Sequence, residues 1–392
     1  MEGENEKTKL DKRQKAAVFF IISALLILHL PTFITPHVEG DEVIYQILAE
    51  KTANNFLDYS TQGTGIVERT GSEIYDTKLF LHPPLFVWSL ALLHKIGLGD
   101  LAVIIPVFSA LMIVFLTFLI ARESGFGNDA LLAGAILAFD PILFFVSSKI
   151  LIEAPLTALI TLSVYLFLLA VRRRGQAGFF FLAGLVFGLA FMTKYMAITA
   201  GPVFLYIFWR KRFDLTNPLR KFLIFTLAAA AIIMPWLVYF SLNSGFGVLM
   251  SRQVTVEYLA RVPFIRMVMD RPWHTFFSGS LFLAPVYFIS CLGIIGAIRR
   301  GRGFFPAVWG LSVFALYTAA VLFTQMAGYS LRFLAPATPA MALLAAQAVG
   351  ANKKLVAFVW PLAFIGLAGG LFSVYWRPGI GDVFSIFEFI RL

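Results

Sequence analysis

The sequence predicts an all-α, polytopic membrane protein, and three observations support this fold class. Hydrophobic residues make up 59% of the 392 residues and charged residues only 14%, whereas a soluble chain has about a quarter charged. The mean hydropathy is +0.82. The apolar residues form runs of about 17 to 22, the length that a hydrocarbon core of about 30 Å requires. The basic residues lie in short clusters between these runs.

Eleven apolar runs are long enough to be spans. They begin near Ala16, Leu101, Ala130, Ala154, Gly178, Met196, Phe222, Phe276, Phe304, Phe333 and Leu355. Basic residues between Lys7 and Lys15 precede the first run, and no small-residue cleavage site follows it. We therefore expect an uncleaved first span with residues 1–15 in the cytoplasm, and a single transmembrane domain over residues 1–392.

The segment Pro83 to Ile96 is apolar, but as a helix it would rise only about 20 Å, too little to cross. If it does not cross, four basic clusters fall on one side: Arg172 to Arg174, Arg210 to Arg212, Arg299 to Arg302, and Lys353 with Lys354. Cytoplasmic loops are rich in Lys and Arg, so these clusters are assigned to the cytoplasm. Residues 83–97 are then predicted as an in-plane helix on the external surface, starting at Pro84.

A second in-plane helix is predicted for residues 41–55, where Val43, Ile44, Ile47 and Leu48 form a helical apolar stripe. Both in-plane helices belong to a first external loop, residues 32–100. The same orientation places a second long loop, residues 241–275, and a tail, residues 377–392, outside.

Composition also excludes some functions. The net charge of +10 is explained by the orientation-setting clusters, so nucleic-acid binding is not expected. The single cysteine, Cys291, excludes an intrachain disulfide.

Seven ionisable residues from distant segments are predicted to meet at the external face: Asp41, Glu42, His82, Lys149, Glu153, Lys194 and Arg332. Ionisable residues near a membrane are costly and tend to mark function. A carboxylate base beside a cationic patch that holds an anion suits group transfer from a lipid phosphate to a hydroxyl.

Each of these residues also has an ordinary structural interpretation. Asp41 is suited to cap the helix that follows it, and Glu42 to favour the positive helix end. His82 precedes Pro83 and Pro84, a proline pair that is suited simply to start the in-plane helix.

The same holds for the later residues. Lys149 and Glu153 are four residues apart, the spacing of a local ion pair on one helical turn. Lys194 and Arg332 stand at span ends, where long cationic side chains extend toward the membrane interface.

The order of the motifs is more specific than any one of them. D-E follows the first span, H-P-P-L precedes an amphipathic helix, S-x-K leads to an acid between the third and fourth spans, T-K follows the fifth, and R-F-L-x-P comes late. Over roughly residues 10 to 350 this resembles the GT-C glycosyltransferases, in the branch of the protein O-mannosyltransferases and the bacterial lipid A aminoarabinose transferases (families 39 and 83). The implied fold is GT-C, with about eleven transmembrane helices.

The resemblance implies an inverting transfer of a sugar, mannose or a related one, from a polyprenyl (dolichyl-type) monophosphate. The acceptor would be a hydroxyl on protein or lipid, at the external face of the plasma membrane. The resemblance also implies roles for the seven residues. Asp41 matches the catalytic aspartate, Glu42 and Glu153 its acidic companions, and His82 the H-P-P histidine, while Lys194 and Arg332 would neutralise the lipid phosphate and Lys149 would assist substrate binding.

Three departures from the family pattern stand out. Glu153 and Lys149 stand where family members usually have aspartate and arginine, and Val103 to Pro106 lacks the arginine that many have early in the second span. The adjacent Asp41 and Glu42 resemble the metal-independent branch, so no metal ligand is assigned and the need for a divalent cation is left open.

Two other classes of function are kept as alternatives. A transporter or flippase for lipid-linked sugars also needs charges and a hydrophobic groove, but its charges should lie near mid-membrane on broken helices of repeated halves. A binding or assembly subunit without catalysis would tolerate replacement of Asp41.

Overall fold

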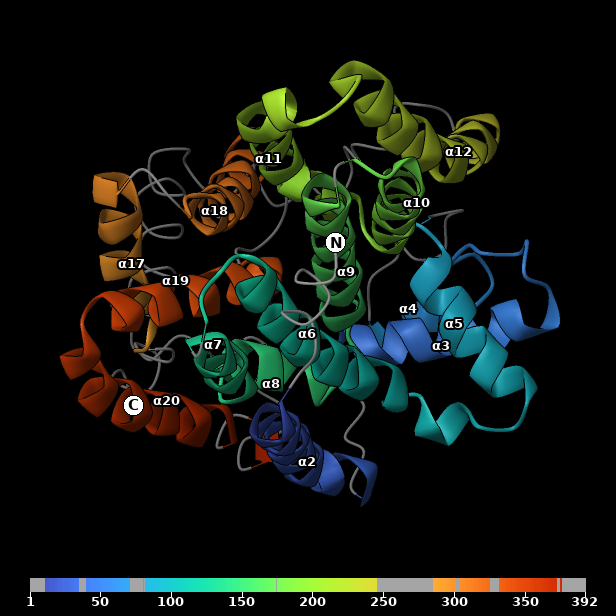
Figure 1. The fold of residues 1–392 in the computed structure, drawn as a ribbon. Coiled ribbons are helices and arrows are strands. Elements are labelled where there is room, and N and C mark those ends of the chain that lie inside the picture. The colour runs from blue at the N-terminus through green and yellow to red at the C-terminus, as the bar shows by residue number, and fades with distance from the viewer. Residues whose placement is uncertain are drawn as a thin grey trace.

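The fold is seen in a computed structural model that describes residues 11–34, 40–70, 80, 82–127, 129–173, 175–244, 285–300, 303–324, 331–371 and 374–375. Throughout these residues the chain is helical, without a strand, so the all-α prediction is confirmed (Figure 1). Residues 245–275 of the second predicted loop and the predicted tail, residues 377–392, lie outside the described part.

Six described helices are long and apolar enough to cross a membrane. They are Lys12–Ile34 (α2), Gly99–Glu123 (which includes α6, Ile104–Glu123), Glu153–Arg172 (α9), Pro218–Asn243 (within α12, Pro218–Ser244), Arg332–Ala351 (which includes α19, Thr338–Ala351) and Lys353–Leu371 (which includes α20, Val356–Leu371). The other predicted runs contain the shorter helices α10 (Ala177–Thr193), α11 (Gly201–Lys211) and α17 (Tyr287–Arg300), and α18 (Phe305–Thr324), which is not among the six candidates. By length and composition the described residues thus provide fewer spans than the eleven predicted.

The predicted span near Ala130 is a bent pair, α7 (Asp129–Ala138) and α8 (Pro141–Ser147), with an angle of 53° between the two helices. Asp140 causes the break, because its carboxylate accepts a hydrogen bond from the Leu143 N–H at 2.8 Å and Pro141 opens the new helix. With the pair counted as one span, the described residues hold seven candidate spans.

The centre of the bundle is α9, which packs against α6, α10 and α11 (Figure 1). Close packing of α10 on α12 depends on two glycines, Gly184 and Gly188. An added Cβ at Gly184 would lie 2.1 Å from the backbone oxygen of Phe225 in α12. Only a residue without a side chain allows this approach.

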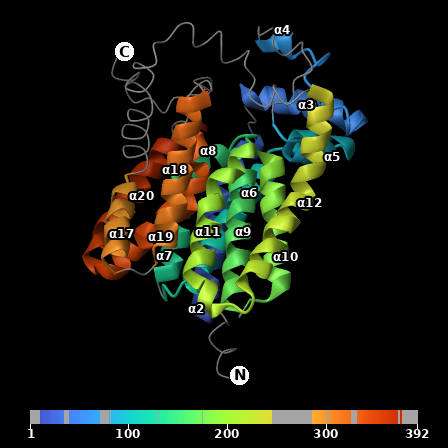
Figure 2. The same ribbon diagram turned by 90° about the horizontal axis from the view of Figure 1, so that it is seen from above.

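Two helices lie across one end of the bundle, away from the N-terminus (Figure 2). They are α3 (Asp41–Asn54) and α5 (Leu85–Lys95), which pack on each other and contribute to one buried apolar cluster. The Trp88 indole N–H donates to the backbone oxygen of Phe56 at 2.9 Å and fixes α5 to the chain that follows α3. The helices predicted at residues 41–55 and 83–97 are thus present as α3 and α5, each slightly shorter than expected.

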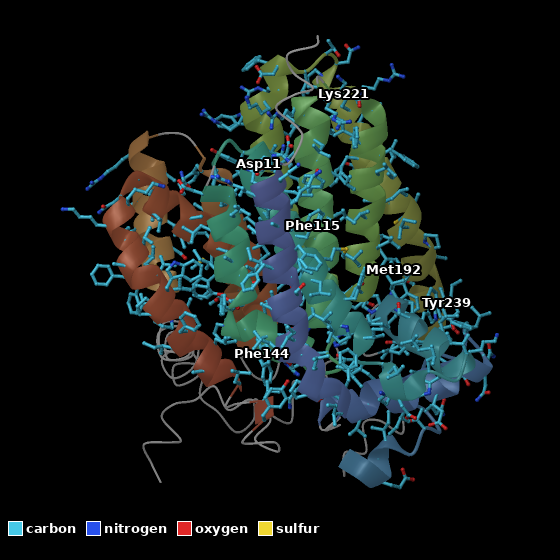
Figure 3. All side chains as sticks on the ribbon, turned by 60° about the horizontal axis from the view of Figure 1, so that its bottom comes forward. Asp11, Phe115, Phe144, Met192, Lys221 and Tyr239 are labelled. Atoms are coloured by element: carbon cyan, nitrogen blue, oxygen red, sulfur yellow. The ribbon has the colours of Figure 1, made fainter. Side chains whose placement is uncertain are left out.

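Helix α12 runs from one end of the bundle to the other. Lys221 and Tyr239 lie near its two ends, and Tyr239 lies on the side of α3 and α5 (Figure 3). The seven ionisable residues that the sequence predicts as a site lie at the end near Tyr239.

Candidate active site

The candidate site forms where four segments meet at the start of α3. They are the first turn of α3, the turn between α8 and α9, the residue that ends α10, and the 3-10 helix Leu331–Ala337 (η8). Helix α9 begins at this end of the bundle and α10 ends there, which brings Glu153 and Lys194 together although they are 41 residues apart.

Glu153 is the centre of the site, with its side chain only 2% exposed. The Lys194 Nζ donates to Glu153 Oε1 at 2.7 Å, and the Arg332 Nε lies 4.0 Å from the same oxygen. A carboxylate this deeply buried is stable only beside cations that compensate its charge.

Arg332 extends this cluster to α3. Its Nη2 donates to Asp41 Oδ2 at 2.6 Å. Asp41, Arg332, Glu153 and Lys194 thus form one row of alternating charges, which we call the charge row. The Asp41 end is the accessible one, with 42% of the side chain exposed.

A second pair lies beside the charge row. The Lys149 Nζ is 3.9 Å from Glu42 Oε1, and the Ile150 backbone N–H donates to Glu42 Oε2 at 2.8 Å. The Glu42 side chain is 3% exposed, so this carboxylate ties α3 to the turn before α9.

Several of the ordinary structural interpretations are wrong. Helix α3 starts after Gly40 without any side-chain capping bond, and the Asp41 carboxylate binds Arg332 instead. Lys149 pairs with Glu42 and Glu153 with Lys194, so each of them is joined to another segment. Lys194, at 9% exposed, is held by a carboxylate and does not extend to the interface. Arg332, at 17% exposed, is held in the same way.

His82 adjoins the charge row without a net charge of its own. Its ring is half-buried and its centroid lies 6.2 Å from that of Tyr45 in α3. Burial is the main cause that lowers the pKa of His82 to about 3; the cations of Lys194 and Arg332 act in the same direction, and Glu153 opposes them. At neutral pH the imidazole is therefore neutral and offers one donor and one acceptor.

Aromatic residues complete the site, and sequence reasoning did not single them out. The Phe333 ring lies under both cations, 4.2 Å from the Lys194 Nζ and 5.0 Å from the Arg332 guanidinium carbon. Tyr45 is buried one helical turn after Asp41. The signals were present, since Phe333 lies within the R-F-L motif and Tyr45 is four residues after Asp41 on the same helix face.

An aromatic pocket of about 230 Å³ opens beside the apolar cluster that α3 and α5 share. Tyr59, Phe80 and Tyr239 line it together with the polar side chains of Asn55, Asp58 and Ser60. Within the described residues, no three His, Cys, Asp or Glu side chains converge in the manner of a metal site.

Residues 81–239 match the model of a family described as dolichyl-phosphate-mannose-protein mannosyltransferase. The chain is also 28% identical to an uncharacterized protein of Aquifex aeolicus (strain VF5) over 325 residues, which is 78% of this chain and 61% of that protein. This chain therefore spans less than two thirds of the length of that relative.

Solved structures share the fold. ArnT from Cupriavidus metallidurans bound to undecaprenyl phosphate is 15% identical with a TM-score of 0.61, over 91% of this chain and 75% of that one. The archaeal oligosaccharyltransferase AglB from Archaeoglobus fulgidus, in complex with an inhibitory peptide and a dolichol-phosphate, is 13% identical with a TM-score of 0.55, over 93% of this chain and 56% of that one.

The fold class is thereby confirmed, since these structures match nearly the whole chain. The family match covers residues 81–239, and the solved structures show that the chain shares the fold of ArnT and of the archaeal oligosaccharyltransferase.

Proposed function

We propose that this protein is an inverting glycosyltransferase that moves a sugar from a polyprenyl monophosphate to an acceptor hydroxyl. The observation that supports this best is the charge row. In it, Arg332 alone separates the exposed Asp41 carboxylate from the buried ion pair of Glu153 and Lys194. One end has the chemistry of a general base and the other the chemistry of a phosphate site.

Asp41 is the base in this proposal. Of the three carboxylates at the site, its side chain is 42% exposed, while those of Glu42 and Glu153 are 3% and 2% exposed. An acceptor hydroxyl can therefore approach only the Asp41 carboxylate without unpacking the site. Glu42 and Glu153 are positioning residues, which hold the cations and the turn before α9.

In the proposed reaction the acceptor hydroxyl gives its proton to Asp41. Its oxygen attacks the anomeric carbon from the face opposite the phosphate, so the configuration inverts. The bond between that carbon and the phosphate oxygen breaks, and its electron pair leaves with the polyprenyl phosphate. Lys194 and Arg332 stabilise this developing charge.

Arg332 links the two ends of the site. It binds Asp41 at 2.6 Å, and a donor phosphate would compete for the same guanidinium. Phosphate binding would thus release the Asp41 carboxylate to act as a base. His82 and Lys149 border this space, where a neutral imidazole and an ammonium group are suited to contact the sugar or its phosphate.

The site is proposed to face outward across the plasma membrane. Its end of the bundle is opposite the basic residues at 172–173, 210–212 and 353–354, which favour the cytoplasmic side. The aromatic pocket lined by Tyr59 and Tyr239 is the proposed acceptor side, because aromatic faces and polar groups together suit a sugar or a peptide. The family description favours mannose as the sugar and a protein as the acceptor.

The test is transfer of radiolabelled sugar from a panel of polyprenyl-phosphate sugars, in proteoliposomes, by the native chain and by Asp41→Asn. Loss of a general base is expected to slow transfer by about 10²- to 10⁴-fold. Donor binding should be retained, because the Lys194 pair with Glu153 is unchanged.

Glu50→Gln is the matched control, an exposed acid of the same helix α3 that lies outside the aromatic pocket. It should transfer at the native rate. Native turnover by Asp41→Asn would remove Asp41 from the chemistry, and movement of the donor across the bilayer without transfer would favour the flippase alternative.

A further inference from the structure

A second cavity lies away from the charge row. A cavity of about 700 Å³ opens at the other end of the bundle, between α6, α9, α11 and α18. Helix α9 separates the two places, since it begins at Glu153 in the charge row and ends at Arg172 on the cavity rim. Its 20 residues rise about 30 Å, so the cavity lies one membrane thickness from the site.

The cavity has an apolar wall and a basic rim. Leu168, Val171 and Phe305 contribute to the wall. The rim holds three cations, Arg172, Arg210 and Lys211, and two acids, Glu123 and Asp214. A ligand that satisfies both must combine an apolar body with an anionic group. The volume lies within the range of about 300 to 1,000 Å³ that is typical of small-molecule sites.

Exposed aromatic residues at the rim are typical of the level where a bilayer meets water. Trp209 and Phe213 flank the rim with 58% and 84% of their surfaces exposed, and aromatic residues of this kind gather at membrane interfaces. The Arg212 guanidinium lies over both rings, at 5.1 Å and 4.3 Å from their centroids. Lys221, at the same end of α12, is seen in Figure 3.

The ion pairs at the rim leave room for a competing anion. Arg172 pairs with Glu123 at 2.5 Å and Lys211 with Asp214 at 2.9 Å, yet both cations are more than half exposed. Exposed pairs of this kind contribute little stability, so a phosphate can take over one partner at small cost.

We propose that this cavity binds an anionic phospholipid, with the phosphate at Arg210 and Lys211 and the acyl chains against the apolar wall. Basic pockets between transmembrane helices on the cytoplasmic side are suited to anionic head groups. This binding is separate from glycosyl transfer and does not depend on the function proposed for the charge row. Its expected effect is to hold α9, α11 and α18 together.

The experiment measures lipid retention by native mass spectrometry of the full chain in detergent, titrated with phosphatidylglycerol or phosphatidylcholine. The native chain is expected to retain phosphatidylglycerol preferentially. Arg210→Gln with Lys211→Gln should lower that retention about tenfold or more, the loss expected on removal of charge-assisted hydrogen bonds. Arg220→Gln, an exposed cation at the same end of α12 but outside the cavity, is the control and should retain the lipid.

Equal loss in the control would overturn the proposal, because it would reduce the effect to general surface charge. Equal retention of the two lipids by the native chain would also overturn it. A third arm adds inorganic phosphate at matched concentration: if it displaces phosphatidylglycerol completely, the site recognises free phosphate and not a lipid. Failure of any arm leaves the Asp41 transfer assay untouched.

Discussion

Replacing Glu153 by glutamine is expected to destabilise the protein by about 3 to 5 kcal/mol, the range for breaking a buried ion pair by removing one partner. The substitution keeps the shape of the side chain but leaves the Lys194 ammonium, 2.7 Å away and nearly buried, without a compensating charge. It also removes the negative charge 4.0 Å from the Arg332 Nε. Neither cation can move to water without disturbing the turn that holds it.

A double-mutant cycle tests this reasoning by denaturant unfolding in detergent. Lys194→Met alone should cost a similar amount, whereas the double variant should be more stable than the sum predicts by about 2 kcal/mol, within the range seen for coupled residues. Asp214→Asn is the control, because its pair with Lys211 is more than half exposed and should be worth less than about 1 kcal/mol. A coupling energy below about 0.5 kcal/mol would show that Glu153 and Lys194 do not stabilise each other.

Three further predictions concern the surroundings of the site and the bundle. The pKa of His82 is lowered from 6.5 to about 3, so between these pH values the unfolded chain binds a proton that the folded chain does not. The melting temperature should therefore decrease as the pH is lowered below 6.5, and it should decrease less in His82→Asn. In unfolding titrations Gly184→Ala should destabilise the protein by about 1 to 3 kcal/mol or more, since the new methyl would lie 2.1 Å from the backbone oxygen of Phe225. Gly178→Ala is the control: its methyl meets nothing within 4 Å and should stabilise α10 by up to about 1 kcal/mol. Trp88→Phe should lower the free energy of unfolding by about 1 kcal/mol in the same titrations, because it removes the 2.9 Å hydrogen bond that fixes α5. An unchanged unfolding midpoint would show that this bond does not stabilise the fold.

Much of the architecture could be predicted from apolar periodicity and from residues that start or end helices. The stripe from Val43 to Leu48 predicted α3, and Pro84 predicted the start of α5 within one residue. Hydropathy could not predict the bend between α7 and α8, because a window average treats Asp140 and Pro141 as two residues inside one apolar run. Their local chemistry is a helix start, which only the capping pattern would have indicated.

For the candidate site, the sequence predicted the end of the bundle but not the pairing. That Glu153 contacts Lys194 and not Lys149 depends on how α9 and α10 are rotated against each other, which apolar residues all around a helix do not specify. The position of the Phe333 ring under two cations depends on the 3-10 geometry of η8, and no local pattern predicts that geometry.

The ion pair between Asp41 and Arg332 joins residues 291 positions apart in the chain. At about 5 to 20 residues per second, a ribosome needs about 15 to 60 s to synthesise that interval. During that time the first-loop carboxylate has already left the ribosome and its arginine does not yet exist. The charge row is therefore completed late in synthesis, and every chain that stops before η8 leaves Asp41 and Glu153 without this cation.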